Sequence, residues 1–247
     1  MWEKGLVDED TYDATLELCD AVAQAYVAGS MSIEEARAYI ERMSNIAFYP
    51  PVKNGVFQIS TPQHLSLFAM LVNDGDTGIS GTLLNDLDMD GIDFTPIGYN
   101  EADPAANKDD QILYSGTFDG QGHRIYNLVI DGTLEGTVKA IGVGLFGNIT
   151  TGACIRNLIL DETCSITGYD RVGLIGRSSK GGAVYLDNLG NEGTVTATYQ
   201  AGAGIMGNAN NGSIAYINNC YSTGAISSGS GKNSAQICGW LGNVGAK

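Results

Sequence analysis

The feature that most constrains the fold is a repeat of about 30 residues in the second half of the chain. One anchor of the repeat is an asparagine in an apolar setting, at Asn127, Asn157, Asn188 and Asn219, with steps of 30, 31 and 31 residues. The other anchor is a pair of apolar residues between two glycines, in GLFG, GLIG, GIMG and GWLG. These glycines are Gly144, Gly147, Gly173, Gly176, Gly204, Gly207, Gly239 and Gly242. A fixed period at two independent anchors indicates a chain built from stacked units.

Each unit has short apolar-alternating runs separated by glycines and shows no helical period. Such a unit cannot bury its own inner face, but it can when copies stack at about 4.8 Å with every strand paired to the next. The pattern therefore predicts a parallel β-helix (solenoid). The repeated asparagines predict a buried ladder of amides at one bend, and the repeated glycines predict corners that few other residues could adopt.

The cysteines fit this pattern without any special chemistry. The chain has five cysteines and no CxxC spacing, which argues against a zinc site and a closed disulfide framework. Alignment on the anchors places three of them in aliphatic columns: Cys220 with Leu189, Cys164 with Val195, and Cys238 with Val172. A free thiol in such a column behaves as a small hydrophobe.

Three regions follow one another along the chain. Residues 1–50 are predicted to form a helical hairpin, in which Ser32 and Glu35 complete a capping box. Residues 51–113 form a leading segment, whose helix Pro62–Asn73 is expected to cover the open N-terminal end of the solenoid. Residues 114–247 hold about four repeats. The predicted fold is therefore mainly β, a parallel β-helix with an N-terminal helical hairpin and a capping helix.

Charge and hydropathy exclude two classes of partner. The chain has 13 Lys and Arg residues against 28 Asp and Glu residues, a net charge of −15. Nucleic acid is excluded because a binder needs a basic face. No apolar run reaches about 18 residues, so direct membrane insertion is not expected, and no signal peptide is present in this chain.

The repeat also carries a resemblance to a known family. GLFG, GLIG, GIMG and GWLG resemble the GLUG motif of bacterial surface proteins. The preceding GTFDGQGHRIYNL is similar to the segment before such repeats in large gut-bacterial (Bacteroidetes-like) cell-surface proteins and in some immunoglobulin A-cleaving metallopeptidases. The resemblance covers about residues 56–242. It implies a right-handed parallel β-helix in a secreted or cell-surface bacterial protein with adhesin-like or spacer roles. We expect the natural protein to be longer, or a partner to cover the last repeat.

Metal and peptidase sites find little support. The chain has two histidines, His64 and His123, and no HExxH spacing for a zinc peptidase. The spacing of three aspartates matches the first half of an EF-hand calcium loop, at Asp86, Asp88 and Asp90. The glutamate that closes such a loop is missing, because its position is occupied by Ile97. A looser structural calcium site on these three carboxylates stays open as an alternative to a solvated strand face. No other cofactor is expected.

Catalysis is the rival to a binding role. Many polysaccharide-degrading enzymes use this architecture, so a lyase or glycoside hydrolase is the alternative function. It would need paired carboxylates, or a base with calcium, on one exposed face. No spacing singles out a pair among the available groups, which are Asp161, Glu162, Asp170, Arg171 and Asp187. We therefore expect a non-enzymatic module.

Tyrosines are the candidate binding residues. They are spread through the repeats at Tyr169, Tyr185, Tyr199 and Tyr216. Outward-facing tyrosines can stack on sugar rings or peptides, whereas the alternative is that they pack locally over the turns. The expected partner is a host or dietary glycan or a host protein, and a pure structural stalk is the remaining possibility.

Overall fold

The structure is a computed structural model that describes residues 20, 22–33, 35–36, 50–99, 112–132, 140–179, 181–210, 212–229 and 232–241. The chain divides into two compact units, residues 1–50 and 51–247. In the first unit the Ser32 amide donates to Glu35 Oε2 (2.8 Å) and the Glu35 amide donates to Ser32 Oγ (3.2 Å). This confirms the capping box, while most of the predicted hairpin lies outside the described residues. No helix in the described ranges is long and apolar enough to cross a membrane.

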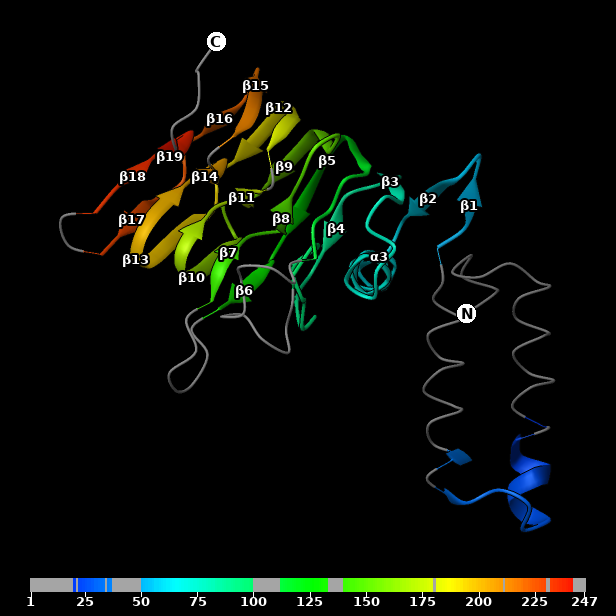
Figure 1. Ribbon diagram of the computed structural model, residues 1–247. Helices are drawn as coiled ribbons and strands as arrows, with labels where there is room; N and C mark the ends of the chain where they lie inside the picture. Colours follow the sequence, from blue (N-terminus) through cyan, green and yellow to red (C-terminus); the bar gives the residue numbers. More distant parts are fainter. Residues whose placement is uncertain are drawn as a thin grey trace. The chain divides into compact units, whose positions relative to one another are not determined.

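The second unit is a parallel β-helix, as predicted, with three sheets that run along its axis (Figure 1). Three complete turns are followed by a fourth whose strands are short. Turn 1 comprises β5 (Thr117–Tyr126), β6 (Val129–Asp131), β7 (Ile141–Val143) and β8 (Phe146–Ile149). Turn 2 comprises β9 (Cys154–Leu160), β10 (Ser165–Val172) and β11 (Ile175–Ser178). Turn 3 comprises β12 (Gly182–Asn191), β13 (Thr194–Ala203) and β14 (Met206–Ala209). Turn 4 comprises β15 (Ser213–Asn218), β16 (Tyr221–Ser222), β17 (Ile226–Ser228), β18 (Ser234–Ala235) and β19 (Cys238–Leu241).

The leading segment extends the largest sheet toward its N-terminal end. β1 (Val52–Lys53) and β2 (Val56–Ile59) form an antiparallel hairpin around Asn54 and Gly55, whose positive φ values of 53° and 77° suit a tight two-residue turn. β2 pairs in parallel with β3 (Ser80–Leu83), and β3 and β4 (Leu87–Asp88) both pair with β5. The nine-stranded sheet therefore includes strands from both the leading segment and the repeats.

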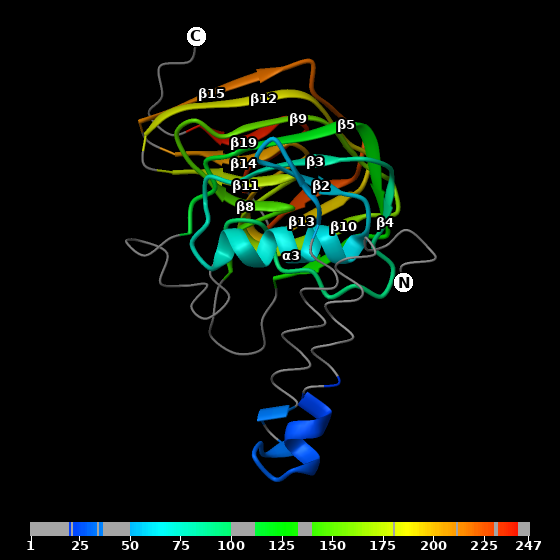
Figure 2. The ribbon, with the colours of Figure 1, turned by 90° about the vertical axis from the view of Figure 1, so that its right-hand side faces the viewer.

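Helix α3 (Pro62–Asn73) closes the N-terminal end of the interior, and Figure 2 shows it lying across that end of the strands. Its N-cap is Thr61, whose hydroxyl accepts from the His64 amide, and a proline stands in its first turn. Phe68 is fully buried, and its ring meets those of Phe57 and Phe118 at centroid distances of 5.8 and 5.7 Å. The helix thus buries its apolar side on the aromatic end of the core and confirms the predicted cap.

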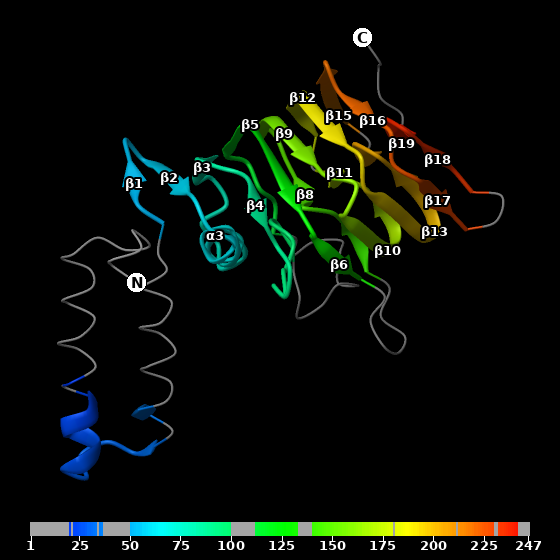
Figure 3. The same cartoon turned by 180° about the vertical axis from the view of Figure 1, so that it is seen from behind.

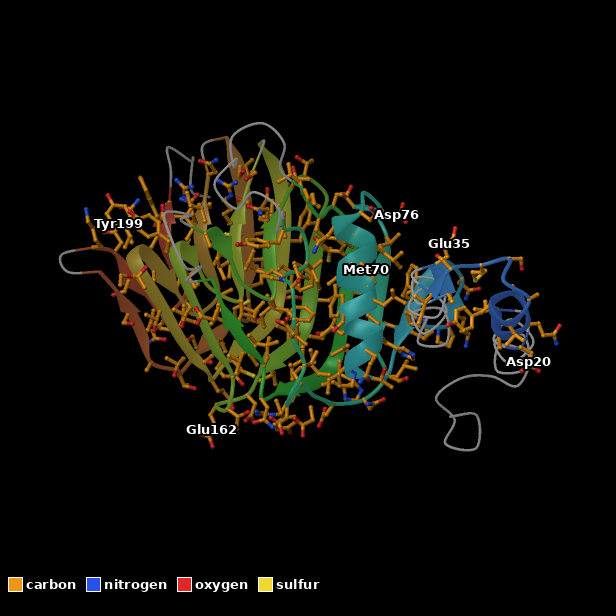
Figure 4. All side chains as sticks on the ribbon, turned by 90° about the horizontal axis from the view of Figure 1, so that it is seen from below. Asp20, Glu35, Met70, Asp76, Glu162 and Tyr199 are labelled. Atoms are coloured by element: carbon orange, nitrogen blue, oxygen red, sulfur yellow. The ribbon has the colours of Figure 1, made fainter. Side chains whose placement is uncertain are left out.

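The interior is a continuous apolar core whose burial ends at the last turn. Side chains fill the space enclosed by the sheets (Figure 4). The apolar pairs of the first three glycine motifs are fully buried: Leu145 and Phe146, Leu174 and Ile175, and Ile205 and Met206. Turn 4 lies at the far end from α3 (Figure 3), and there Trp240 and Leu241 are 39% and 54% exposed.

The sequence alignment therefore placed the fourth glycine motif three residues too late. Met206 pairs with Cys238, and Asn208 pairs with Trp240. The structural counterpart of GIMG is QICG, residues 236–239, so Gly239 holds the place of the second glycine, not the first. This explains the long last step of 35 residues in the sequence and corrects the prediction that placed Cys238 beside Val172.

The first asparagine anchor is also out of register. Asp119 pairs with Arg156 and His123 pairs with Leu158, so residues 120–122 bulge opposite Asn157 alone. Gln121, with φ of 54°, holds the position that Asn157 holds in turn 2 with φ of 55°. Asn127 lies at a later corner. A separate difference at the next corner, which has four residues in turn 2 (161–164) and two in turn 3 (192–193), moves Cys164 away from Val195, which pairs with Ile166.

The asparagine ladder exists in part and is not buried. Asn188 Nδ2 donates to Asn157 Oδ1 at 3.0 Å, and Asn157 Nδ2 donates to Asp119 Oδ1 at 2.9 Å. Asn219 instead donates to Asp187 Oδ1 at 3.2 Å. Asn157 is half-buried, whereas Asn188 and Asn219 are exposed. Asparagine recurs because these corners need a left-handed backbone, with φ between 53° and 55°, which asparagine tolerates better than most residues.

The repeated glycines have a different cause from the predicted one. No left-handed φ occurs at Gly144, Gly173 or Gly204. A Cβ at Gly144 would lie 2.3 Å from the carbonyl oxygen of Gly173, and a Cβ at Gly204 would collide with the Ser222 side chain and lie 2.5 Å from the carbonyl oxygen of Gln236. These glycines are needed because the backbones of adjacent turns approach too closely for any side chain.

Candidate functional site

The outer face of the nine-stranded sheet presents two columns of side chains along the solenoid axis. Strand register gives the first column, which is Val56, Ser80, Thr117, Cys154, Tyr185 and Tyr216. It also gives the second, which is Gln58, Thr82, Asp119, Arg156, Asp187 and Asn218. The first column is small at its N-terminal end and aromatic at its C-terminal end, and the second is polar throughout.

The four predicted binding tyrosines form two stacked pairs on two different sheets. Tyr185 and Tyr216 stack on the nine-stranded sheet, with ring centroids 5.3 Å apart and planes inclined by 8°. Tyr169 and Tyr199 stack on the six-stranded sheet, at 5.0 Å and 9°. Lys232 Nζ lies 4.8 Å from the centre of the Tyr199 ring, and Tyr199 points outward from the ribbon (Figure 4). The four tyrosines therefore do not share one face.

The two pairs differ in how much of each ring face is open. Tyr199 stacks on Tyr169, and Lys232 Nζ also lies 4.8 Å from the centre of its ring, so a sugar would have to displace this ammonium group to share the ring. Tyr185 meets Tyr216 on one face, and the neighbour on its other side is Cys154, whose side chain is too short to cover a ring. Tyr185 is 46% exposed. One ring-sized stacking position is thus open above Cys154, about one strand spacing from Tyr185.

A groove of about 500 Å³ continues from this position toward the N-terminal end of the sheet. Its floor is made of small and polar residues of the two columns, among them Ser80, Thr82 and Thr117. Lys53 lies at one end of it and Arg156 at the other, beside Cys154 in the strand β9. The open ring position and the groove together form the candidate site.

Asp119 organises the wall of the groove. Its Oδ1 accepts from the Gln121 amide (2.9 Å) and from Asn157 Nδ2 (2.9 Å), and its Oδ2 accepts from Arg156 Nε (2.8 Å). Burial alone would raise the pKa of this carboxyl, but the bonds from Asn157, Gln121 and Arg156 outweigh it and leave the pKa below its usual value. Asp119 is therefore an ionised anchor that holds Arg156, whose side chain remains 47% exposed.

A second polar network ties the corner between the nine-stranded and six-stranded sheets. Arg124 binds Glu192 through two bonds of 2.8 and 3.0 Å and Asp161 through one of 3.1 Å. Tyr221 Oη donates to Glu192 Oε1 at 2.6 Å. Bonds from Arg124 and Tyr221 hold the pKa of Glu192 below its usual value. We call these four residues the Arg124 network; its groups bind one another, so it is structural.

The structure does not bring the calcium candidates together. Asp86 accepts from the Arg124 amide and lies 3.0 Å from His123 Nδ1, while Asp88 accepts from Asn127 Nδ2 and from the Asp90 amide. In the part of the chain that the structure describes, no three acidic, histidine or cysteine side chains form a metal-binding group. Calcium binding stays a prediction, and a calcium titration followed by melting temperature and calorimetry would test it.

The candidate catalytic groups are scattered. Asp161 binds Arg124, and Glu162 points to solvent from a turn (Figure 4). Asp170 is buried on the six-stranded sheet, where burial raises its pKa, although Arg171 lies nearby. Asp187 alone lies on the outer face of the nine-stranded sheet. The residues described in the groove thus contain no pair of carboxyl groups in which one is held protonated by its surroundings, as a general acid requires.

Sequence reasoning missed the polar half of the site. Lys53, Asp119 and Arg156 come from three strands far apart in the sequence, and only strand register places them around one groove. The available signal was the glycine on each side of Gln121, which is typical of a bulge. A bulge there would have aligned Asp119 with Arg156.

Comparisons with known proteins support the fold. No family model matches the sequence, so the GLUG resemblance stays a prediction. A stretch of 113 residues, 46% of this chain, is 37% identical to halomucin of Haloquadratum walsbyi, of which it covers 1%. A crystal structure from Bacteroides ovatus, described as that of "a putative immunoglobulin A1 protease", matches with a TM-score of 0.50 and 18% identity. That match covers 77% of this chain and 62% of the other, and at this identity it shows the fold alone.

Proposed function

We propose that the second unit is a non-catalytic glycan-binding module of a longer secreted or cell-surface protein. The observation that carries the proposal is the open stacking position between Tyr185 and Cys154, next to a groove lined by polar side chains. Carbohydrate sites combine an aromatic platform, which contacts the apolar face of a sugar ring, with polar groups that bind its hydroxyls. Both parts are adjacent here and belong to rigid strands.

The proposed location and family have weaker, independent support. The motif resemblance to GLUG-containing surface proteins and the fold shared with a protein described as an immunoglobulin A1 protease both favour an exported, adhesin-like module. The chain spans a small part of halomucin and less than two thirds of the Bacteroides ovatus chain, which favours one module within a larger protein.

The register of the tyrosine column supplies a direct test. In the variant Cys154→Tyr a third ring would extend the Tyr185–Tyr216 stack and occupy the position proposed for the sugar. The variant should fold, because it repeats a contact already present one turn further on. A glycan array would first identify a ligand, and calorimetry would then give its Kd for wild type and variant.

We expect Cys154→Tyr and Tyr185→Ala each to weaken binding at least tenfold, about 1.4 kcal/mol, as is usual for a buried aromatic contact. Tyr199→Ala is the matched control, because its ring also belongs to a stacked tyrosine pair but lies on another sheet, away from the groove. Normal binding by Cys154→Tyr, at an unchanged melting temperature, would refute the site. Release of reducing ends from the bound glycan would instead favour the polysaccharide-degrading alternative.

A further inference from the structure

The groove crosses the strands instead of following one of them. Its lining residues come from β1, β2, β3, β5 and β9, which are successive neighbours in the nine-stranded sheet. Four strand spacings correspond to about 19 Å along the solenoid axis, and the Tyr185 ring adds one more. A ligand that fills the whole site is therefore linear and lies along the axis.

The charged groups that remain available in the groove are cationic. The Asp119 carboxylate already accepts from three donors of the protein. Arg156 binds Asp119 through Nε only, and its two terminal guanidinium nitrogens have no partner among the residues described. Lys53 is exposed on β1 and, within the same described ranges, has no ion-pair partner. A ligand thus meets N–H donors at both ends of the groove, and the one carboxylate between them, Asp119, is paired with Arg156. Asp187, which accepts from Asn219, lies outside the groove on the far side of Arg156, in the strand of Tyr185.

The charged side chains that line the groove, Lys53 and Arg156 against Asp119, sum to +1, which is opposite in sign to the net charge of −15 of the whole chain. A strongly acidic protein repels polyanions in general, so a cationic groove on it selects anions that can place their charges at fixed points. Arginine is suited to oxyanions because its planar fork can bind two oxygens at once. The oxyanions that linear glycans carry are carboxylates of uronic acids and sulfate esters.

We infer that the ligand is a linear acidic glycan, extended along the solenoid axis, with anionic groups at Lys53 and Arg156 and a sugar ring on Tyr185. The inference rests on the proposed glycan-binding function and adds the charge and direction of the ligand. One sugar unit advances a linear chain by about one strand spacing. About five units should therefore fill the site.

The test compares oligomers of a linear polyuronate, two to eight units long, with the same oligomers after reduction of their carboxyl groups. We expect affinity to rise with length up to about five units and then to level off. Reduction should weaken binding at least tenfold, and so should an increase in salt. A sulfated oligomer of equal length forms a third arm, which distinguishes sulfate from carboxylate as the bound oxyanion.

Lys53 gives a matched pair of variants, because its side chain makes no hydrogen bond or ion pair with any residue that the structure describes. Lys53→Met should weaken binding of the acidic oligomer about fivefold to tenfold and leave the reduced oligomer unchanged, whereas Lys53→Arg should retain wild-type affinity. Equal binding of acidic and reduced oligomers, with loss of both in Cys154→Tyr, would overturn the inference and keep the proposed function. Binding of acidic oligomers that Cys154→Tyr leaves intact would overturn the shared site. Absence of binding to every arm would overturn both.

Discussion

Replacement of Gly144 by alanine tests whether close backbone approach explains the repeated glycines. A Cβ at this position would lie 2.3 Å from the Gly173 carbonyl oxygen and 2.7 Å from that of Leu174. Both atoms belong to the backbone of the next turn, so neither can rotate away. The Leu174 oxygen also accepts from the Phe146 amide at 3.1 Å, and a shift of that carbonyl weakens this bond between turns.

The expected loss of stability can be estimated from these contacts. Overpacking at a site that cannot relax costs about 1–3 kcal/mol, and a lost backbone hydrogen bond costs about 1 kcal/mol more. We therefore expect Gly144→Ala to lower the free energy of unfolding by about 2–4 kcal/mol. Gly152→Ala is the control, because Gly152 has a left-handed φ of 92° and open space around it, with no atom closer than 3.7 Å to the added Cβ. It should lose about 1–2 kcal/mol from backbone strain alone.

Urea unfolding, followed by circular dichroism with wild type alongside, gives both values from the midpoint and slope of the transition. If close approach is the cause, Gly144→Ala is clearly the less stable variant. The reasoning is refuted if Gly152→Ala is destabilised as much as Gly144→Ala or more, since conformation and not crowding would then decide where glycine is needed.

Three further predictions concern the cap, the groove wall and the corner. Phe68→Ala should lower the free energy of unfolding by about 3–5 kcal/mol, because it empties a fully buried aromatic site, and Phe68→Leu should lose less; urea unfolding measures both. The pKa of Asp119 is lowered in the folded protein, so this carboxylate contributes its full stabilisation above the unfolded pKa of about 3.9 and loses it as the pH falls below that value. In melts at a series of pH values, Asp119→Asn should therefore lose less stability than wild type between pH 5 and 2. An equal dependence of stability on pH in the two proteins would contradict this. Arg124→Met should lower the free energy of unfolding by roughly 1 kcal/mol, and Arg124→Lys should be almost as destabilised, because lysine cannot make two parallel bonds to Glu192. Wild-type stability of Arg124→Lys in thermal melts would show that charge alone matters.

The fold was predictable from the sequence because its signals are local and repeated. The bounds of the helix Pro62–Asn73 follow from a proline near its start, a cap at Thr61 and an apolar stripe, and the structure reproduces them. The parallel β-helix follows from the period, which any stacking of units must respect.

The register at both ends of the repeat array was not predictable from the motifs. The sequence around Asn127 resembles that around Asn157, yet the bulge at Gln121 gives Asn127 a different place in the turn. In the last turn GWLG matches the glycine pattern, while the less regular QICG takes the structural position because its Cys238 pairs with Met206. A sequence motif reflects the backbone conformation that its own residues must adopt. Register depends on how a strand pairs with the neighbouring turn, and similarity between motifs does not reveal that pairing. The candidate site depends on register and was therefore predicted only for Tyr185 and its stacking partner.

The Arg124 network has a consequence for how the solenoid comes apart. Solenoids are usually treated as a row of units that interact only with their nearest neighbours, so that the end units fray one at a time. Arg124 belongs to turn 1, Asp161 to turn 2 and Glu192 to turn 3, and Tyr221 of turn 4 binds the same glutamate. A single guanidinium thus couples turns that do not touch through their strands. Under pulling force along the axis, this corner should yield in one step that releases several turns together, and Arg124→Met should divide that step into smaller ones.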